Sequence, residues 1–382
     1  HLKDGRGHAP SVNWPKDDAV SMFLRLSIPP INEEQRDLIA KHRLNVIPDP
    51  TYGEQLQDLA IQGHHAEGKM WIEYQEIEHF FEDGSIVSLR KPTYSILNWK
   101  YGKPHPQLLI SPRVAPPMIG LGLLEAVSQK DILANADPED TNNDGISGKA
   151  NLVWDTQKQK VALGRFGWKA GEPNIRQQSS KAFNADIGIS APLVKTPWGD
   201  CTPTQQKCRN APNGNTASQN NLEISPEAMD KLVFYAQNLA VPARRDISES
   251  KVLAGKKLFY DTNCVSCHRP KFVTKRFPEQ PEQSFQLIWP YTDLLLHDMG
   301  EGLADNRPEG LASGSEWRTA PLWGIGLTET VNGHTQFLHA GRARNLLEAI
   351  LWHGGEAELS KQNFLKFNPK ERSELLAFLR SL

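Results

Sequence analysis

The strongest chemical signal in the sequence is Cys264-Val-Ser-Cys267-His268, two thiols separated by two residues and followed at once by an imidazole. Thiols at this spacing add across the vinyl groups of a porphyrin, and the next histidine then becomes the proximal ligand of its iron. A thioredoxin-like dithiol or half of a zinc site fits less well, because the sequence has no second Cys-x-x-Cys and no redox βαβ pattern before the motif. The motif therefore predicts haem c bound covalently through Cys264, Cys267 and His268.

The remaining cysteines, Cys201 and Cys208, enclose the polar loop Thr-Pro-Thr-Gln-Gln-Lys and have no histidine nearby. Haem c is attached outside the cytoplasm, where disulfides form and persist. We therefore expect a periplasmic or otherwise extracytoplasmic protein in which Cys201 and Cys208 form a structural disulfide. Two free thiols are the alternative.

Bulk composition limits the other classes of function. A chain of 382 residues is long enough for two domains, and a formal net charge of −2 with scattered Lys and Arg gives no basic surface for nucleic acid. No apolar run approaches the roughly 18 residues needed to cross a bilayer. We expect a chain that binds no nucleic acid and spans no membrane.

Helical periodicity and chain-breaking residues outline the elements that must position the motif. Apolar residues at helical spacing follow a serine cap at Ser225, and the stretch around Pro242 is typical of a linker. The boundary predicted near residue 244 gives an N-terminal domain, 1–243, and a C-terminal domain, 244–382. The expected fold class is mainly α, with long loops and little β. In the second domain, helices are predicted at Val252–Phe259, Asn345–Trp352 and Glu371–Leu382.

An independent pattern is Asp140-Thr-Asn142-Asn-Asp144-Gly-Ile146. It places oxygen ligands at positions one, three and five, then a glycine for the turn and a backbone carbonyl, as in a calcium-binding loop. Position twelve is Asn151 instead of a bidentate glutamate, so we expect a weaker Ca²⁺ site. A solvated turn rich in Asp and Asn is the alternative.

Three further segments resemble a known family: Gly164-Arg-Phe-Gly-Trp168-Lys, the stretch from Trp289 to Asp305, and Phe337-Leu-His339-Ala-Gly-Arg342-Ala-Arg. Together they are similar to the thiol-oxidoreductase-like di-haem oxidoreductases, within the bacterial di-haem cytochrome c peroxidase superfamily, over nearly the whole chain. The resemblance implies two cytochrome c-like domains with one haem each. The N-terminal haem meets peroxide, and the C-terminal haem stores an electron.

The family attaches its first haem just before a segment similar to Leu2-Lys-Asp-Gly-Arg6-Gly. By resemblance, His1 is the histidine of a Cys-x-x-Cys-His motif whose cysteines lie upstream, and it is therefore a ligand of the first iron. The sequence opens at His1 without a Met or a signal peptide. Either the chain is processed or truncated, or the first haem is not attached covalently.

The iron held by His268 needs a sixth ligand if its haem stores an electron. In the family this ligand lies fourteen residues beyond the histidine that matches His339, which is His353 here. His353 also ends a predicted helix just before a glycine, a position suited to a side chain turned inward. Met299, the only methionine after Cys264, is the alternative.

The resemblance also assigns residues to the peroxide side. Trp168 matches a tryptophan between the two haems, and Gln178 matches a distal-pocket glutamine. Asp186 stands two residues before the family's glutamate, as a substitute general acid or base for O–O cleavage. Structural roles are the alternatives: core packing for Trp168, a surface amide for Gln178, and a turn or cap for Asp186. Glu125 is a rival acid that fits an ordinary helix.

Two arginines and two histidines lie in matching segments of the second domain. Arg318 and Arg342 are candidates to pair with haem propionates, because a guanidinium binds carboxylates bidentately and stays charged when partly buried. His297 and His339 are expected to be buried hydrogen-bonding residues.

These expectations combine into a peroxidase-like di-haem c-type oxidoreductase. It moves electrons between a six-coordinate C-terminal haem and a peroxide-reactive N-terminal haem. Its partners are hydrogen peroxide or a related oxidant, and a small redox protein or other electron donor. An electron-transfer cytochrome c without catalytic activity is the alternative. Thiol oxidation, which the family name suggests, has no redox-active dithiol in the sequence to support it.

Overall fold

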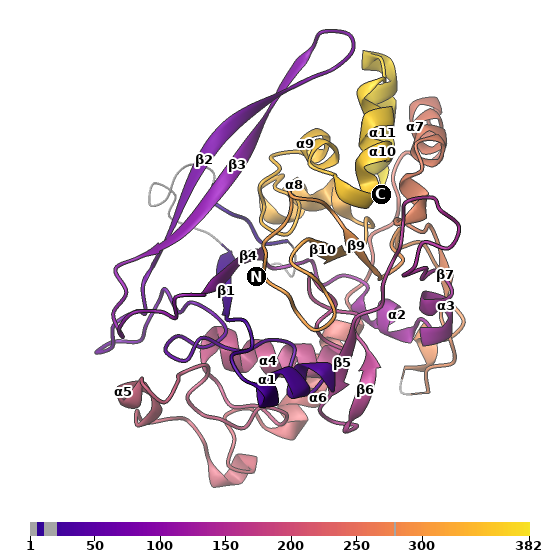
Figure 1. Cartoon of the computed structure of the whole chain (residues 1–382). Helices are drawn as coiled ribbons and strands as arrows, with labels where there is room; N and C mark the ends of the chain where they lie inside the picture. The colour runs from indigo at the N-terminus through magenta and orange to yellow at the C-terminus, as the bar shows by residue number, and fades with distance from the viewer. Residues whose placement is uncertain (1–5, 11–20, 279) are drawn as a thin grey trace.

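The computed structural model describes residues 6–10, 21–278 and 280–382 (Figure 1). The predicted iron ligand His1 lies outside these residues. The first half contains β1 (Met22–Ser27), α1 (Glu33–Ala40), β2 (Lys69–Phe80), β3 (Ile86–Leu97), β4 (Leu109–Val114), α2 (Leu121–Ala126), α3 (Gln129–Leu133), β5 (Leu152–Asp155), β6 (Lys160–Leu163), α4 (Ile175–Ile187), α5 (Gln206–Arg209) and α6 (Pro226–Gln237). The second half contains α7 (Ser250–Asp261), β7 (Phe272–Val273), β8 (Leu287–Ile288), β9 (Leu296–Asp298), β10 (Glu316–Arg318), α8 (Thr328–Asn332), α9 (Leu346–Leu351), α10 (Glu358–Leu365) and α11 (Pro369–Ser381).

Helices and long loops predominate in the described chain, in line with the predicted class. Its strands pair only as two-stranded antiparallel ladders: β1–β4, β2–β3, β5–β6, β7–β8 and β9–β10. The expectation of little β is right only in part, because β2 and β3 are twelve residues long each. The hairpin was missed since Pro92 stands within β3, where proline argues against a strand.

The predicted helices near the motif are confirmed as α6, α7, α9 and α11. Ser225 caps α6 by accepting a hydrogen bond of 3.1 Å from the Ala228 amide. Asn345 caps α9 in the same way, by accepting 2.9 Å from the Glu348 amide. Helix α11 begins earlier than predicted, because Asn368 is its cap and the following proline suits the first helical position.

Helix α7, which leads into the Cys264 motif, packs closely against α11. A methyl group at Gly255 would lie 1.9 Å from the carbonyl oxygen of Glu374, so only glycine allows this approach. The rings of Phe259 and Phe378 meet at 5.2 Å, and Tyr291 contacts both. This contact fixes the end of α7, and with it the start of the Cys264 loop.

The β2–β3 hairpin extends across the molecule to the C-terminal helices (Figure 1). Phe81 at its tip meets Phe364 of α10 edge to face at 5.9 Å, and the guanidinium of Arg372 lies 4.1 Å from the centre of the Phe81 ring. Arg372 also pairs with Asp83 at 2.6 Å. The N-terminal half is therefore joined to the last two helices by both apolar and charged contacts.

One apolar core includes buried residues from both sides of residue 244, among them Leu24, Trp168, Phe259 and Phe378. A second core lies mainly between α2, α4, α6 and the β7–β8 ladder. The boundary near residue 244 and the division into two cytochrome c-like domains stay predictions. Within the described residues, no helix is long and apolar enough to cross a membrane.

Candidate haem site

An apolar cavity lies where α7, α9, α10 and α11 meet β9, β10 and the loops that follow these two strands. Its volume is about 1420 Å³, counting the space at its open mouth. Cys264 and Cys267 lie on its wall in a short 3₁₀ turn directly after α7, and neither forms a disulfide. Burial raises the pKa of Cys264 to about 11 and also raises the pKa of Cys267, so both are neutral thiols.

His268 and His353 line the same cavity, and main-chain carbonyls orient both imidazoles. Nδ1 of His268 lies 2.9 Å from the carbonyl oxygen of Tyr291, and Nδ1 of His353 lies 2.7 Å from that of Ala349. A carbonyl only accepts, so Nδ1 carries the proton and Nε2 keeps its lone pair. Burial lowers the pKa of His268 to about 4 and also lowers that of His353, which keeps both rings neutral.

The donor set fits haem c. Two free thiols and two neutral imidazoles with unprotonated Nε2 atoms share one apolar cavity, and His353 is close enough to lower the pKa of His268 further. Neutral imidazole is the form that ligates iron. Met299 lies on the same wall. His353 stays the first candidate for the sixth ligand because its tautomer is already set for a metal, and Met299 stays the alternative.

His297 lies between two carboxylates beside Cys267. Nε2 is 2.7 Å from Asp293, and Nδ1 is 2.5 Å from Glu356 and 3.5 Å from the Cys267 sulfur. Burial alone lowers the pKa of His297, but the hydrogen bonds with Asp293, Cys267 and Glu356 raise it well above the ordinary value. His297 is therefore a buried, hydrogen-bonded imidazolium, and both of its nitrogens are occupied by these partners.

Glu356 connects His297 with the predicted calcium loop through hydrogen bonds to Ser147. It accepts 3.1 Å from the amide and 2.6 Å from the hydroxyl of Ser147, and Ile146 reaches the cavity wall. Within the loop, Asp140 accepts from the amides of Asp144 and Gly145, so its carboxylate serves the turn itself. No group of three or more His, Cys, Asp or Glu side chains among the described residues could hold a metal ion. The Ca²⁺ site at Asp140, Asn142, Asp144 and Ile146 stays a prediction without support.

Three buried arginines surround the haem cavity. Arg318 and Arg6 line it, and Arg342 lies behind it against Trp352, 5.1 Å from the ring centre. Each donates to a main-chain carbonyl, of Gly167, Leu338 and Gly302 respectively. Burial lowers the pKa of Arg6 and of Arg318 to about 10, so both stay charged at neutral pH.

Neither Arg318 nor Arg342 forms an ion pair with a carboxylate of the described residues, and Nε of Arg342 has no partner among them. A buried charge without a counterion is costly. Haem brings two propionates, and the pairing of Arg318 and Arg342 with them stays a prediction.

Trp168 lies in the cavity wall, where Nε1 donates 2.6 Å to the carbonyl of Val114. The Arg6 guanidinium stacks 5.2 Å from the centre of the Trp168 ring. The main chain of Trp168 accepts 2.8 Å from the amide of Arg318. The predicted relay residue therefore contacts the haem cavity directly, and it is also part of the core.

Trp317 and His339 form a second aromatic pair on this wall. Their rings stack at 3.6 Å with 9° between the planes. His339 is buried as predicted, but its Nε2 has no hydrogen-bond partner within the described residues. Lys169 lies 4.4 Å from the Trp317 ring centre and pairs with Asp305 at 2.9 Å. Burial and the nearby cations Arg342, Arg113 and Lys169 lower the pKa of His339 well below its ordinary value, so it is neutral.

Of the residues assigned to the peroxide side, Trp168 lines this cavity, whereas Gln178 and Asp186 do not. Gln178 of α4 lies beside Gly167, the residue before Trp168. A methyl group at Gly167 would be 3.9 Å from Oε1 of Gln178. That Oε1 is buried without a partner within the described residues. Asp186, near the end of α4, is exposed and lies 3.9 Å from Arg25. Glu125 accepts from the Ile175 amide and from Gln237, a structural role.

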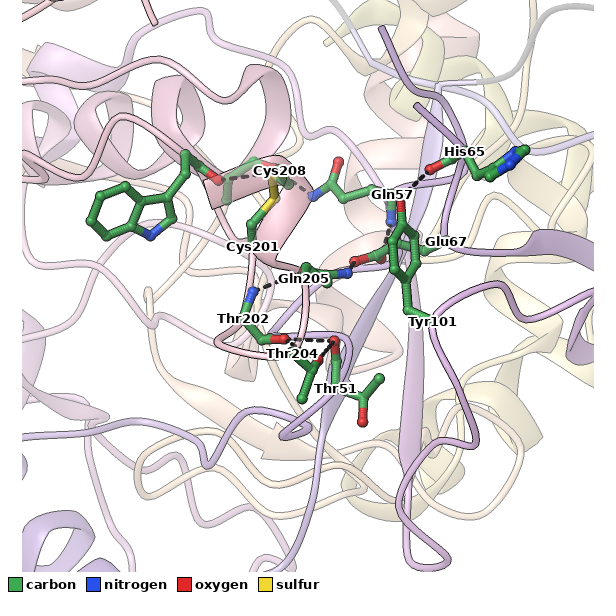
Figure 2. Close-up of a disulfide and its surroundings, with 12 residues drawn as sticks. Thr51, Gln57, His65, Glu67, Tyr101, Cys201, Thr202, Thr204, Gln205 and Cys208 are labelled. Atoms are coloured by element: carbon green, nitrogen blue, oxygen red, sulfur yellow. Dashed lines mark hydrogen bonds between the residues drawn. A yellow bond between two sulfur atoms is a disulfide. The ribbon is translucent and has the colours of Figure 1, made fainter. Parts of the chain in front are cut away.

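The predicted disulfide between Cys201 and Cys208 is confirmed (Figure 2). Gln205 in its loop donates 2.5 Å to Glu67, and the Thr202 hydroxyl donates 2.8 Å to the carbonyl of Thr51. Burial raises the pKa of Glu67 to about 7. The bridge therefore holds its loop against residues 51–67, and neither of its cysteines lines the haem cavity.

Sequence reasoning missed Arg6, Trp317 and Tyr291 as parts of the site. Arg6 and Tyr291 fall within segments that carried the family resemblance, so their position was the available signal. Trp317 had none, because its place depends on the β9–β10 pairing with His297.

Replacing His297 tests the buried charge cluster. His297→Gln leaves Asp293 and Glu356 without their shared cation and is expected to lower the free energy of unfolding by about 3–5 kcal/mol. The folded-state pKa of His297 lies above the unfolded value of about 6.5. Its stabilisation is therefore complete below that pH and is lost as pH rises, so the loss is larger at pH 6 than at pH 9. Urea unfolding at both pH values measures this, with the exposed His65→Gln as control; equal losses at both values would contradict it.

Replacing each candidate sixth ligand tests the haem geometry. We expect His353→Ala to convert the haem on His268 from low-spin to high-spin iron, because its sixth ligand is removed. Met299→Ala and the control His65→Ala leave the spectrum unchanged. Electron paramagnetic resonance and visible absorption of the haem-loaded proteins measure the change. A high-spin signal in Met299→Ala alone would make Met299 the ligand.

Comparisons with known proteins show the family of the chain. No curated protein sequence matches the chain significantly. A solved structure of Kuenenia stuttgartiensis hydrazine synthase under xenon pressure is 13% identical, covers 93% of this chain and 90% of its own, and has a TM-score of 0.34, which is too low to carry an argument. The family described as "Di-haem oxidoreductase, putative peroxidase" matches residues 1–382. The chain therefore belongs to the di-haem oxidoreductases, a family whose cofactor is haem.

Proposed function

We propose that this chain is an extracytoplasmic, peroxidase-like di-haem c oxidoreductase that passes electrons from a redox partner to hydrogen peroxide. The observation that carries the proposal is the cavity in which His268 and His353 present unprotonated Nε2 atoms while Trp168 lies in the wall. If both imidazoles ligated the iron, the site would suit electron storage. Peroxide would then react at the other haem, whose ligand we assign to His1.

Haem supplies an iron that exchanges single electrons and, where one axial position is open, binds small oxidants. The chain's own residues decide which of these happens. The main-chain acceptors of His268 and His353 hold both rings in place and leave both Nε2 atoms free to ligate iron. Arg318 and Arg342 supply positive charge for the propionates.

Trp168 is the proposed path between the two haems. Its indole lies on the cavity wall and is fixed through Nε1, and the main chain of Arg318 bonds to its carbonyl. The Arg6 guanidinium over the ring opposes a full positive charge there. We therefore assign Trp168 the passage of an electron and not the storage of an oxidising equivalent.

Gln178 and Asp186 complete the proposal on the peroxide side. Oε1 of Gln178 is buried without a partner among the described residues, and we assign it the role of orienting a hydrogen-bond donor such as peroxide. Asp186 is the proposed proton carrier, and its exposure on α4 leaves its carboxylate in exchange with water.

The second candidate is an electron-transfer cytochrome c without catalysis. The paired imidazoles favour it, because a haem with both axial positions filled carries electrons but binds no oxidant. The two candidates differ only in whether the other haem has an open position.

Peroxide titration separates them. We expect the ferric holoprotein isolated from its own host to show one low-spin and one high-spin haem, and the high-spin absorption to shift on adding hydrogen peroxide. Two low-spin haems with no response to peroxide would refute the peroxidase and leave the electron carrier.

Trp168→Phe tests the relay. We expect peroxide-dependent oxidation of a reduced donor to slow by at least about tenfold, because phenylalanine is far harder to oxidise and cannot bond to Val114. Both haem spectra stay as in the parent protein. Trp71→Phe is the matched control, since the Trp71 indole donates to Glu73 on β2 and does not line the cavity. Equal slowing in both variants, or none in Trp168→Phe, would rule out the relay.

A further inference from the structure

The chain leaves the haem motif through a small ladder whose outer face is apolar. Four residues after His268 it enters β7, and from β8 it returns through Trp289 to Tyr291, whose carbonyl holds the His268 ring. The Thr292 amide also donates 2.9 Å to the carbonyl of Arg269. The β7–β8 ladder is therefore attached at both ends to the loop that carries the iron ligand.

The two faces of the β7–β8 ladder differ from those of an ordinary surface hairpin. In its register, Phe272 pairs with Ile288 and Val273 with Leu287. Phe272 and Ile288 point inward and belong to the second apolar core. A hairpin with one covered face normally presents polar side chains to water. Here the exposed side carries apolar residues: Val273 (53% exposed), Phe285 (70%), Leu287 (56%) and Trp289 (41%).

The backbone of the exposed Phe285 is also strained. Its φ of 56° lies in the left-handed region, which is costly for a bulky residue. The conformation is fixed by Thr274, whose carbonyl accepts from the Phe285 amide and whose hydroxyl accepts from the Gln286 amide. The ring gains no burial within the described chain that offsets this cost.

Cations cluster in the sequence next to the apolar side. Residues 269–278 contain four cations and no carboxylate, and Glu279 and Glu282 follow in the connection to β8. The cations Arg269, Lys271, Lys275 and Arg276 are all exposed, and none pairs with a carboxylate of the described residues. Lys271 lies 6.0 Å from the Trp289 ring centre, so cation and apolar surface are continuous. The nearest described acid in the connection is Glu282.

We infer that the outer side of the β7–β8 ladder, formed by Val273, Phe285, Leu287 and Trp289 with a rim of Arg269, Lys271, Lys275 and Arg276, is the docking surface for an acidic redox protein. Apolar contact supplies affinity, and the cationic rim attracts and orients a partner whose own apolar patch is surrounded by carboxylates. One electron leaves the partner's reduced metal centre and reduces ferric haem on His268 to ferrous. The inference rests on the proposed function only in that this haem receives electrons.

The test measures electron entry without peroxide. Ferric holoprotein is mixed in a stopped-flow instrument with a reduced acidic cupredoxin, and reduction of the haem is followed in the Soret band. The expected second-order rate constant falls as salt rises. We expect Leu287→Asp and Lys271→Glu/Lys275→Glu each to lower it by about tenfold or more, the second also removing the salt dependence.

Matched controls keep the result specific. Leu59→Asp, at a side chain that is 84% exposed elsewhere, leaves the rate constant unchanged. Dithionite reduces every variant at the parent rate, which shows that haem and fold are intact. Carbodiimide cross-linking provides a second readout, with bonds from the cupredoxin carboxylates mapped by mass spectrometry to Lys271 and Lys275.

Three results would overturn the inference: equal rate constants in all variants, faster reduction by a basic cytochrome c than by the cupredoxin, or a dimer in sedimentation that Leu287→Asp dissociates. The last would make a second copy of this chain the occupant. A peroxide response with unaffected docking variants removes the docking surface alone. Docking effects without a peroxide response remove the proposed peroxidase alone.

Discussion

A pair of hydrogen bonds to main-chain carbonyls decides what the haem cavity can do. Each bond fixes the proton on Nδ1 of an imidazole and leaves Nε2 as a lone pair. If either carbonyl moved, the ring would be free to rotate or to change tautomer, and its Nε2 would no longer be set for the iron that we propose it binds. The carbonyl of Ala349 lies in α9, and that of Tyr291 lies in a loop packed against α7 and α11. The chemistry therefore depends on helix packing far more than on the two histidines alone.

The buried cations near the cavity fall into two groups, those that pair with a carboxylate and those that do not. The imidazolium of His297 is matched by Asp293 and Glu356, and Lys169 is matched by Asp305. Arg318 and Arg342 form no ion pair with a carboxylate of the described residues, although Asp293 and Asp305 respectively favour their charge from a greater distance. In the proposed function these two cations pair with the haem propionates.

The local chemistry was predictable from the sequence, whereas its surroundings were not. Cys264, Cys267 and His268 act through their spacing, and helix caps such as Ser225 act within one turn, so both follow from neighbouring residues. The disulfide of Cys201 and Cys208 closes a short loop and was predictable for the same reason. The stacking of Arg6 on Trp168 joins residues far apart in the chain, so no local sequence pattern predicts it. The long strand β3 was not predictable because it contains Pro92. The exposed position of the Phe285 ring was not predictable either, because it depends on a left-handed backbone conformation that is rare for phenylalanine.

The hairpin contact with α10 and α11 also bears on the order of folding. The hydrogen bond between Arg372 and Asp83 joins residues 289 positions apart, so it forms only when nearly the whole polypeptide is available. Closing so long a loop costs more conformational entropy than closing a short one, so this contact is expected to form after the local ones. A bulky planar molecule would have to reach the two thiols before α10 and α11 close over the cavity that they line.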